Sequence, residues 1–230
     1  LVTGATRGIG RAITEEIKSL GNLYVTGRNE KLLKELNAKD YCVCDLSRYP
    51  SGLIDFVKDN NIDVLINNAG DYLYSSVDKL TFDDIEKIYN TNLLSPTQLI
   101  SSAVPFMKGN KWGRIINIGS ISGVMGEANA SIYSASKAGL VGLTKALALE
   151  LAEFNITVNT INPGWVDTDL GNSSIDVSEF SKEEIIQCIP QKRFVTPQEV
   201  AKLVKYLISE DARGITGQSI NLCAGLSVGI

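Results

Sequence analysis

Short apolar runs alternate with amphipathic segments along the whole chain. The apolar runs predict strands at 1–3, 23–27, 41–44, 64–67, 114–119, 157–161 and 219–222. The segments between them repeat apolar positions at helical spacing and predict helices at about 9–20, 30–37, 51–60, 82–107, 131–154 and 197–209. Strand–helix alternation at this rhythm predicts an α/β fold, with a doubly wound parallel sheet of seven strands and helices on both faces.

The stretch from about 165 to 196 is the least regular part of the chain. A long segment after a strand of such a fold is often a mobile lid on the substrate side, and we expect that role here. No break in composition divides the 230 residues, so residues 1–230 are predicted to form a single domain. The first predicted strand begins at Leu1 itself, so we expect a few residues to precede this sequence.

Composition narrows the class of protein. The apolar fraction of 44% and the charged fraction of 21% are typical of a soluble globular protein. A net charge of −4 argues against broad attraction to nucleic acid or to an anionic membrane, and no apolar run approaches the ~20 residues that span a bilayer. The chain has no histidine and no paired cysteine spacing, so we predict no metal site. Reduced cysteines in a cytoplasmic protein are the simplest interpretation.

The most informative side chains lie in and just before the predicted helix 131–154. Tyr133 and Lys137 are four residues apart, so they share one face of that helix. A phenol has a reference pKa near ~10, and a neighbouring ammonium group favours the phenolate and lowers that pKa. Tyr133 is therefore a candidate general acid or base, and Ser120, thirteen residues upstream, is a candidate to hold a substrate oxygen.

A glycine-rich segment follows the first predicted strand. Residues 3–10 read Thr-Gly-Ala-Thr-Arg-Gly-Ile-Gly and open the first predicted helix. Glycines allow a tight turn, and the helix N-terminus offers N–H groups to a pyrophosphate. The Gly-x-x-x-Gly-x-Gly spacing differs from the more common Gly-x-Gly-x-x-Gly, and a simple strand-to-helix turn is the alternative. The strand–turn–helix context favours dinucleotide binding.

Together these motifs resemble the single-domain short-chain dehydrogenase/reductase family, which has a Rossmann-type fold. Residues 67–70 (Asn-Asn-Ala-Gly) and 163–168 (Pro-Gly-Trp-Val-Asp-Thr) resemble its segments beside the adenosine and the nicotinamide. The resemblance covers nearly the whole chain and implies an NAD(P)-dependent oxidoreductase that interconverts a carbonyl and a secondary alcohol by hydride transfer. The cofactor-binding residues that it implies are Gly4, Thr6, Arg7, Gly8, Ile9, Gly10, Arg28, Asp45, Leu46, Asn68, Ala69, Gly70, Tyr133, Lys137, Pro163, Gly164, Val166 and Thr168.

The resemblance also implies a catalytic tetrad of Asn92, Ser120, Tyr133 and Lys137. In those roles Tyr133 exchanges a proton with the substrate oxygen, and Lys137 lowers the pKa of Tyr133 and binds the nicotinamide ribose. Ser120 orients the substrate oxygen, while Asn92 holds a water molecule in the proton relay. Ser122 competes with Ser120, but the spacing to Tyr133 favours Ser120, and we interpret Ser122 as a turn residue.

The end of the second predicted strand bears on cofactor choice. It closes at Arg28 without a carboxylate at its tip, and Arg28 and Arg7 are candidates to hold the 2′-phosphate of NADP. Glu30 is the opposing signal, because a carboxylate there could bind the ribose hydroxyls of NAD. Behind Asn29, however, Glu30 is typical of a first helical turn. The sequence therefore favours NADP(H) over NAD(H).

Three segments (113–123, 189–200 and 215–218) most resemble 3-oxoacyl-(acyl-carrier-protein) reductases of fatty acid biosynthesis. That resemblance implies a small-molecule or carrier-bound carbonyl substrate. Two features depart from it. These reductases are expected to have basic residues at two positions that flank the pocket, and here one position is Lys111 but the other is Phe154. In addition, residues 221–225 (Asn-Leu-Cys-Ala-Gly) replace the usual Asn-Gly-Gly ending. A reductase of a sugar, a steroid-like compound or a small ketone is an alternative. A non-catalytic nucleotide-binding regulator is another, and the complete tetrad argues against it.

The two longest predicted helices indicate self-assembly. Segments 82–107 and 131–154 carry more small and apolar residues than one sheet face can cover, and 220–230 ends the chain on further apolar residues. The family resemblance implies a homotetramer with two-fold axes. A monomer whose C-terminal segment folds over its own core is the alternative.

Overall fold

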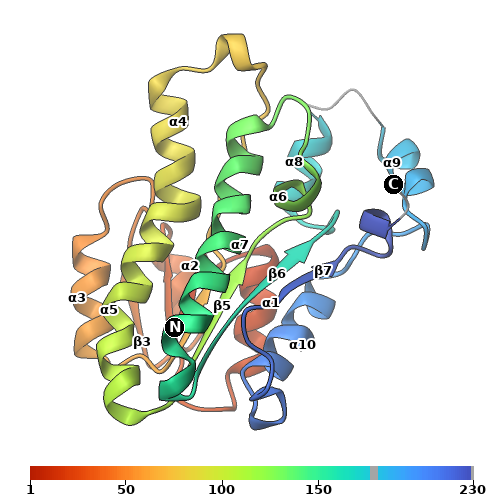
Figure 1. The fold of residues 1–230 in the computed structure, drawn as a ribbon. Coiled ribbons are helices and arrows are strands. Elements are labelled where there is room, and N and C mark those ends of the chain that lie inside the picture. Colours follow the sequence, from red (N-terminus) through yellow and green to blue (C-terminus); the bar gives the residue numbers. More distant parts are fainter. Residues whose placement is uncertain (177–180, 229–230) are drawn as a thin grey trace.

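The computed structural model describes residues 1–176 and 181–228. Seven parallel strands form one sheet in the order β3-β2-β1-β4-β5-β6-β7 (Figure 1). Their bounds are β1 Val2–Thr3, β2 Tyr24–Gly27, β3 Asp40–Val43, β4 Val64–Asn67, β5 Gly113–Ile118, β6 Ile156–Pro163 and β7 Ser219–Leu222. The order reverses at β1, with β2 and β3 on one side and the later strands on the other. The predicted doubly wound fold is confirmed.

Helices cover both faces of this sheet (Figure 1). Their bounds are α1 Gly8–Ile17, α2 Glu30–Lys34, α3 Ser51–Asp59, α4 Phe82–Tyr89, α5 Ser95–Asn110, α6 Ser122–Met125, α7 Ser131–Leu151, α8 Asp169–Asp176, α9 Lys182–Cys188 and α10 Pro197–Leu207. Helices α1 and α10 pack against each other on one face, whereas α3, α5 and α7 lie on the other. In the described ranges, no helix is both long and apolar enough to cross a bilayer.

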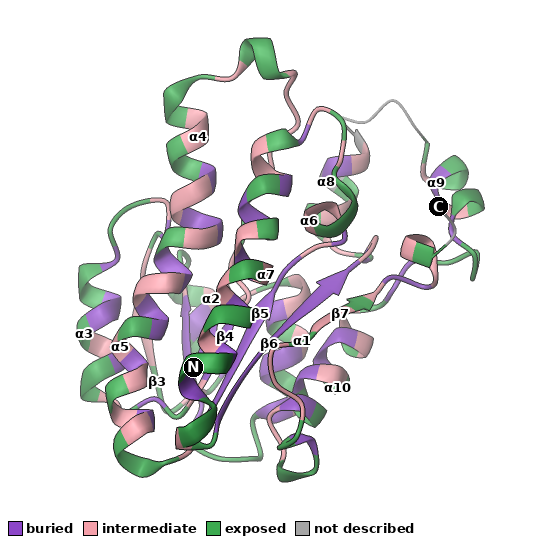
Figure 2. Ribbon diagram, in the orientation of Figure 1, coloured by how far each residue is buried: buried purple, intermediate pink, exposed green. Residues whose placement is uncertain are grey.

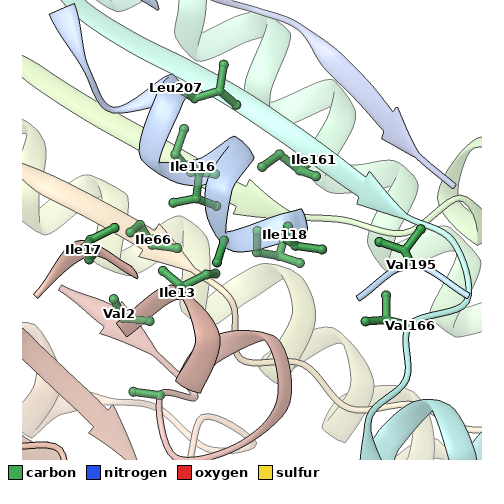
Figure 3. Close-up of a cluster of buried hydrophobic side chains, with 14 of the residues drawn as sticks. Val2, Ile13, Ile17, Ile66, Ile116, Ile118, Ile161, Val166, Val195 and Leu207 are labelled. Carbon is green, nitrogen blue, oxygen red and sulfur yellow. The ribbon is translucent and has the colours of Figure 1, made fainter. Parts of the chain in front are cut away.

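Two hydrophobic cores lie on the two sides of the sheet because successive strand residues point to opposite faces. In β5, Ile116 packs into the core with Ile13 of α1 and Leu207 of α10 (Figure 3). Its neighbour Ile115 belongs to the second core, with Leu99 of α5. All six residues of β5 are buried, and Figure 2 shows the central strands β5 and β6 in the colour of buried residues. A strand that is covered on both faces reads as a continuous apolar run, which is the pattern from which this sheet was predicted.

The structure corrects the prediction of one regular helix over 82–107. A π-helical turn, Asn90–Leu94, separates α4 from α5, and the N–H of Ser95 bonds the carbonyl of Asn90. Helical periodicity is present on both sides of this turn, so the pattern could not reveal one extra residue between them.

The stretch from 165 to 196 is more regular than predicted, because it contains α8 and α9. Helix α9 begins with a capping box, in which the Ser181 hydroxyl accepts from the N–H of Glu184 and the Glu184 carboxylate accepts from the N–H of Ser181. The sequence Ser-Lys-Glu-Glu carries that signal. Residues 177–180 of the predicted lid lie outside the described residues.

Candidate active site

A cavity of about 910 Å³ opens at the carboxyl ends of the strands. It is lined by the segments that follow β1 to β6, so it spans the point where the strand order reverses. Crevices at this point are where doubly wound sheets bind their ligands. Every residue predicted to bind the cofactor lines it, namely Gly4, Thr6, Arg7, Gly8, Ile9, Gly10, Arg28, Asp45, Leu46, Asn68, Ala69, Gly70, Tyr133, Lys137, Pro163, Gly164, Val166 and Thr168.

The glycine turn between β1 and α1 forms one wall of the cavity. Gly4 and Gly8 have φ values of +63° and +52°, which L side chains rarely adopt. A Cβ on Gly10 would lie 2.1 Å from the carbonyl oxygen of Gly4, so only glycine fits there. The Asn68 amide donates to the carbonyls of Thr3 and Gly4, at 2.8 and 3.2 Å, and ties the turn to the end of β4. The turn is therefore fixed, with the N-terminus of α1 beside the cavity.

Two arginines line the same cavity beyond the glycine turn. Neither Arg7 nor Arg28 has a carboxylate within 4.0 Å among the described residues. Glu30, by contrast, pairs with Lys34 at 2.9 Å and accepts a hydrogen bond from the Tyr41 hydroxyl at 3.0 Å. It lies in the first turn of α2, as predicted, and is not part of the cavity wall. A fixed glycine turn with two available guanidinium groups fits a dinucleotide that carries a 2′-phosphate.

Tyr133 and Lys137 lie one turn apart at the start of α7, and both line the cavity. Lys137 is buried, and its Nζ donates to the carbonyl oxygen of Ile118 at 2.9 Å and lies 5.8 Å from the centre of the Tyr133 ring. Desolvation lowers the pKa of Lys137 to about 8. Desolvation also raises the pKa of Tyr133 to about 12, although a hydrogen bond with Ser120 acts in the opposite direction. The predicted lowering of the Tyr133 pKa by Lys137 is therefore not found in the chain itself.

Ser120 belongs to a chain of hydrogen bonds that ends on a carboxylate. Its Oγ is 3.1 Å from the Oγ of Ser122, and the Ser122 hydroxyl donates to Oε2 of Glu127 at 2.7 Å. The Tyr72 hydroxyl donates to Oε1 of Glu127, also at 2.7 Å. The Tyr72 ring meets the Tyr133 ring edge-on, with centroids 5.0 Å apart.

These contacts correct the interpretation of Ser122, which opens the short helix α6 and bonds both Ser120 and Glu127. Glu127 and Tyr72 were missed in the sequence. Neither belongs to a motif, and the one available signal was a carboxylate between Ser120 and Tyr133. Their proximity depends on how the loops after β4 and β5 fold together.

Asn92 does not line the cavity, although it lies directly behind it. It is fully buried in the π-helical turn, where its Oδ1 accepts from the N–H of Asp71 at 2.8 Å. Its amide donates to the carbonyl of Asp71 at 2.9 Å and to the Ser136 hydroxyl at 3.1 Å. The side chain thus clamps the backbone that follows β4. A Cβ on Gly70 would lie 3.3 Å from Nζ of Lys137 and 3.5 Å from Oδ1 of Asn92, so this backbone passes close to the lysine.

Lys111 and Phe154, the two positions expected to flank the pocket, lie elsewhere. Lys111 precedes β5 and Phe154 precedes β6, so both lie at the amino ends of the strands, opposite the cavity. Neither is part of the cavity wall, and Nζ of Lys108 lies 4.8 Å from the centre of the Phe154 ring. The prediction that they flank the pocket is wrong within one chain, because both residues precede strands and the cavity lies where the strands end.

The fold and the cavity define a Rossmann-type oxidoreductase, and comparison with known proteins identifies its family. The family model described as enoyl-(acyl carrier protein) reductase matches residues 4–227. The chain belongs to the short-chain dehydrogenase/reductase family. The family predicted from the motifs is therefore confirmed.

Individual relatives cover almost the whole chain. It is 37% identical over 232 residues to the 3-oxoacyl-(acyl-carrier-protein) reductase FabG of Rickettsia conorii, a match that covers 98% of this chain and 95% of the relative. Among solved structures it is similar to a variant of the actinorhodin polyketide ketoreductase with NADPH (TM-score 0.88, 34% identity, 99% and 96% of the two chains). It is also similar to a putative NAD(P)-dependent gluconate 5-dehydrogenase from Beutenbergia cavernae with bound NADP (TM-score 0.91, 30% identity, 99% and 96%).

Proposed function

We propose that this chain is an NADPH-dependent reductase that converts the ketone of a 3-oxoacyl thioester to a secondary alcohol. The observation that carries the proposal is the convergence of Ser120, Tyr133 and Lys137 on the cavity that is also lined by the glycine turn. The name of the Rickettsia relative supports this substrate class, and the solved relatives with NADP or NADPH support the cofactor. Arg7 and Arg28 would hold the 2′-phosphate.

In this function NADPH supplies the hydride when bound, and the chain positions the substrate and supplies a proton. Tyr133 donates its phenolic proton to the substrate oxygen. Burial raises the pKa of Tyr133 to about 12, so the phenol carries that proton at neutral pH. Ser120 would orient the oxygen, and Lys137, whose ammonium donates to the end of β5, would bind the nicotinamide ribose. Asn92 fixes the backbone at Asp71, next to the Gly70 backbone that passes close to Lys137.

Oxidation of NADPH, followed by absorbance, tests the proposal. The substrates are a 3-oxoacyl group on acyl carrier protein, the same group on N-acetylcysteamine, the matching enoyl thioester, and a keto sugar. We expect reduction of the 3-oxoacyl thioesters and loss of that activity in Tyr133→Phe. Ser101→Ala, which removes a hydroxyl outside the cavity, is the matched control and should keep activity. Oxidation of NADPH by the enoyl thioester alone would contradict the proposal.

A reductase of a sugar or small ketone is the second candidate. One observation favours it: the chain resembles a putative gluconate 5-dehydrogenase. The same assay separates the candidates. Efficient turnover of the keto sugar, with no preference for the carrier-bound thioester over its N-acetylcysteamine form, would favour this second function.

We propose that the chain forms a homotetramer. The outward face of α7 carries the exposed small residues Ala135, Ala138 and Gly142, and Leu149 on the same helix is 86% exposed. Exposed apolar surface of this kind is typical of a subunit interface. Light scattering should give about four times the chain mass of 24.9 kDa, and Leu149→Glu should lower it. A monomer with full activity would contradict the proposal.

We also propose that residues 1–230 act as one domain, with 165–196 as its substrate-side lid. Leu170 of α8 and Ile185 and Cys188 of α9 line the cavity, which supports this role. Amide hydrogen exchange in α8 and α9 should slow when NADPH and substrate bind, and unchanged exchange would argue against a lid. The four cysteines are free, which fits a reducing compartment such as the cytoplasm.

A further inference from the structure

Glu127 is a carboxylate in the cavity wall, two hydrogen bonds away from Ser120 through the Ser122 hydroxyl. Each of its oxygens accepts one hydroxyl bond, from Tyr72 or from Ser122, both at 2.7 Å. An ionised carboxylate has about four acceptor positions, so roughly two remain for a ligand. Tyr72 packs edge-on against the ring of Tyr133, which brings Glu127 beside the group that would protonate the substrate.

Charges near Glu127 do not neutralise it. Within the described residues, no lysine or arginine lies within 4.0 Å of its carboxylate. Of the cations on the cavity wall, Lys87 pairs with Asp71 at 2.7 Å, whereas Arg7 and Arg28 line the part of the cavity beyond the glycine turn. Lys137 keeps its charge while it donates to the carbonyl of Ile118, and its Nζ lies 5.8 Å from the centre of the Tyr133 ring. Glu127 is therefore a carboxylate near Tyr133 that forms no ion pair within the described residues.

We propose that Glu127 is a specificity-determining residue that selects carbonyl substrates by charge. It disfavours ketones that carry their own carboxylate near the reacting carbonyl and favours ketones that present a cation there. Like charges placed together in a poorly hydrated site repel strongly, whereas a cation gains a charge-assisted hydrogen bond. The inference rests on the proposed function, because it requires carbonyl reduction at Tyr133.

Two matched pairs of small ketones test the inference with NADPH as reductant. Methyl acetoacetate and acetoacetate differ by one negative charge, and 5-methylhexan-2-one and 4-(dimethylamino)butan-2-one differ by one positive charge. For the wild-type chain we expect kcat/KM to be lower for the anion, and higher for the cation, by at least about tenfold relative to the neutral partner. Glu127→Gln should bring both ratios close to one, and because each ratio compares two ketones in the same variant, a change in rate common to both cancels.

Glu153→Gln is the matched control, because it removes the same charge from an exposed residue that does not line the cavity. It should leave both ratios unchanged. Reduction of the neutral ketones with the same charge ratios in wild type and Glu127→Gln would overturn this inference alone. Failure of the wild-type chain to reduce any neutral ketone or 3-oxoacyl thioester would contradict the proposed function and this inference with it. A thermal unfolding midpoint of Glu127→Gln close to that of the wild type distinguishes a change in selectivity from a loss of folding.

Discussion

Nζ of Lys137 donates to the carbonyl oxygen of Ile118 at 2.9 Å, which joins the first turns of α7 to the last residue of β5. The bond gives the ammonium a fixed partner in a site where burial lowers the pKa of Lys137 to about 8. A cation is thereby kept beside Tyr133 at the expense of its own hydration. A buried ammonium group of this kind suits a site that receives an anionic cofactor.

Tyr133→Phe should lower turnover by at least about 10²–10⁴-fold, because it removes the proposed proton donor. The affinity for NADPH should change little, since the ring keeps its edge-on contact with Tyr72. Stopped-flow turnover and a fluorescence titration of NADPH measure the two effects. Turnover close to that of the wild type would refute the catalytic role of Tyr133.

Lys137→Met should abolish turnover and weaken NADPH binding, yet raise the free energy of unfolding at pH 7. The folded-state pKa of Lys137, about 8, lies below the value of ~10.4 for an unfolded lysine. The unfolded chain therefore binds more protons between these pH values, and wild-type stability from this group rises with pH from about 8 to ~10.4. At pH 7 the free energy of unfolding of the methionine variant should exceed that of the wild type by on the order of 1–3 kcal/mol, a figure that allows for loss of the Ile118 bond. This difference should shrink as the pH rises from about 8 to ~10.4. Urea unfolding at several pH values measures it, and an advantage that grows with pH would contradict the expectation.

Arg28→Ala should raise the dissociation constant for NADPH much more than that for NADH. A charge-assisted hydrogen bond contributes on the order of 1.5–3 kcal/mol, which is roughly ten- to hundred-fold in affinity. Titration with each cofactor measures the ratio of the two dissociation constants. Arg213→Ala, at an exposed position outside the cavity, should leave it unchanged. Equal losses for the two cofactors would show that Arg28 does not bind the 2′-phosphate.

Gly10→Ala should destabilise the chain by more than about 3 kcal/mol, because its Cβ would lie 2.1 Å from the backbone oxygen of Gly4 and cannot be accommodated without moving the turn. Gly52→Ala in α3 is the control, since a Cβ there meets nothing within 4 Å. It should be neutral or stabilising by up to ~1 kcal/mol. Thermal and urea unfolding compare the two, and similar stabilities would contradict the steric argument.

The sheet could be predicted because each buried strand is a short apolar run that is bounded by turn residues. The glycine turn and the Tyr133–Lys137 pair could be predicted because spacing alone fixes their local geometry. The Glu127 contacts with Tyr72 and Ser122 could not, since they join loops that are distant in sequence. The raised pKa of Tyr133 could not be predicted from the spacing of residues either, because desolvation depends on everything packed around the ring.

The π-helical turn at Asn90–Leu94 behaves as a one-residue insertion in an otherwise regular helix. Removing one residue from it would restore ordinary i to i+4 bonding, and α4 and α5 could then continue as one helix. Everything before the deletion would rotate by ~100° relative to α5, which would turn the buried amide of Asn92 away from the backbone of Asp71. The irregular turn therefore ties the length of this segment to the active site: a chain one residue shorter here would gain helical regularity and lose the wall behind Lys137.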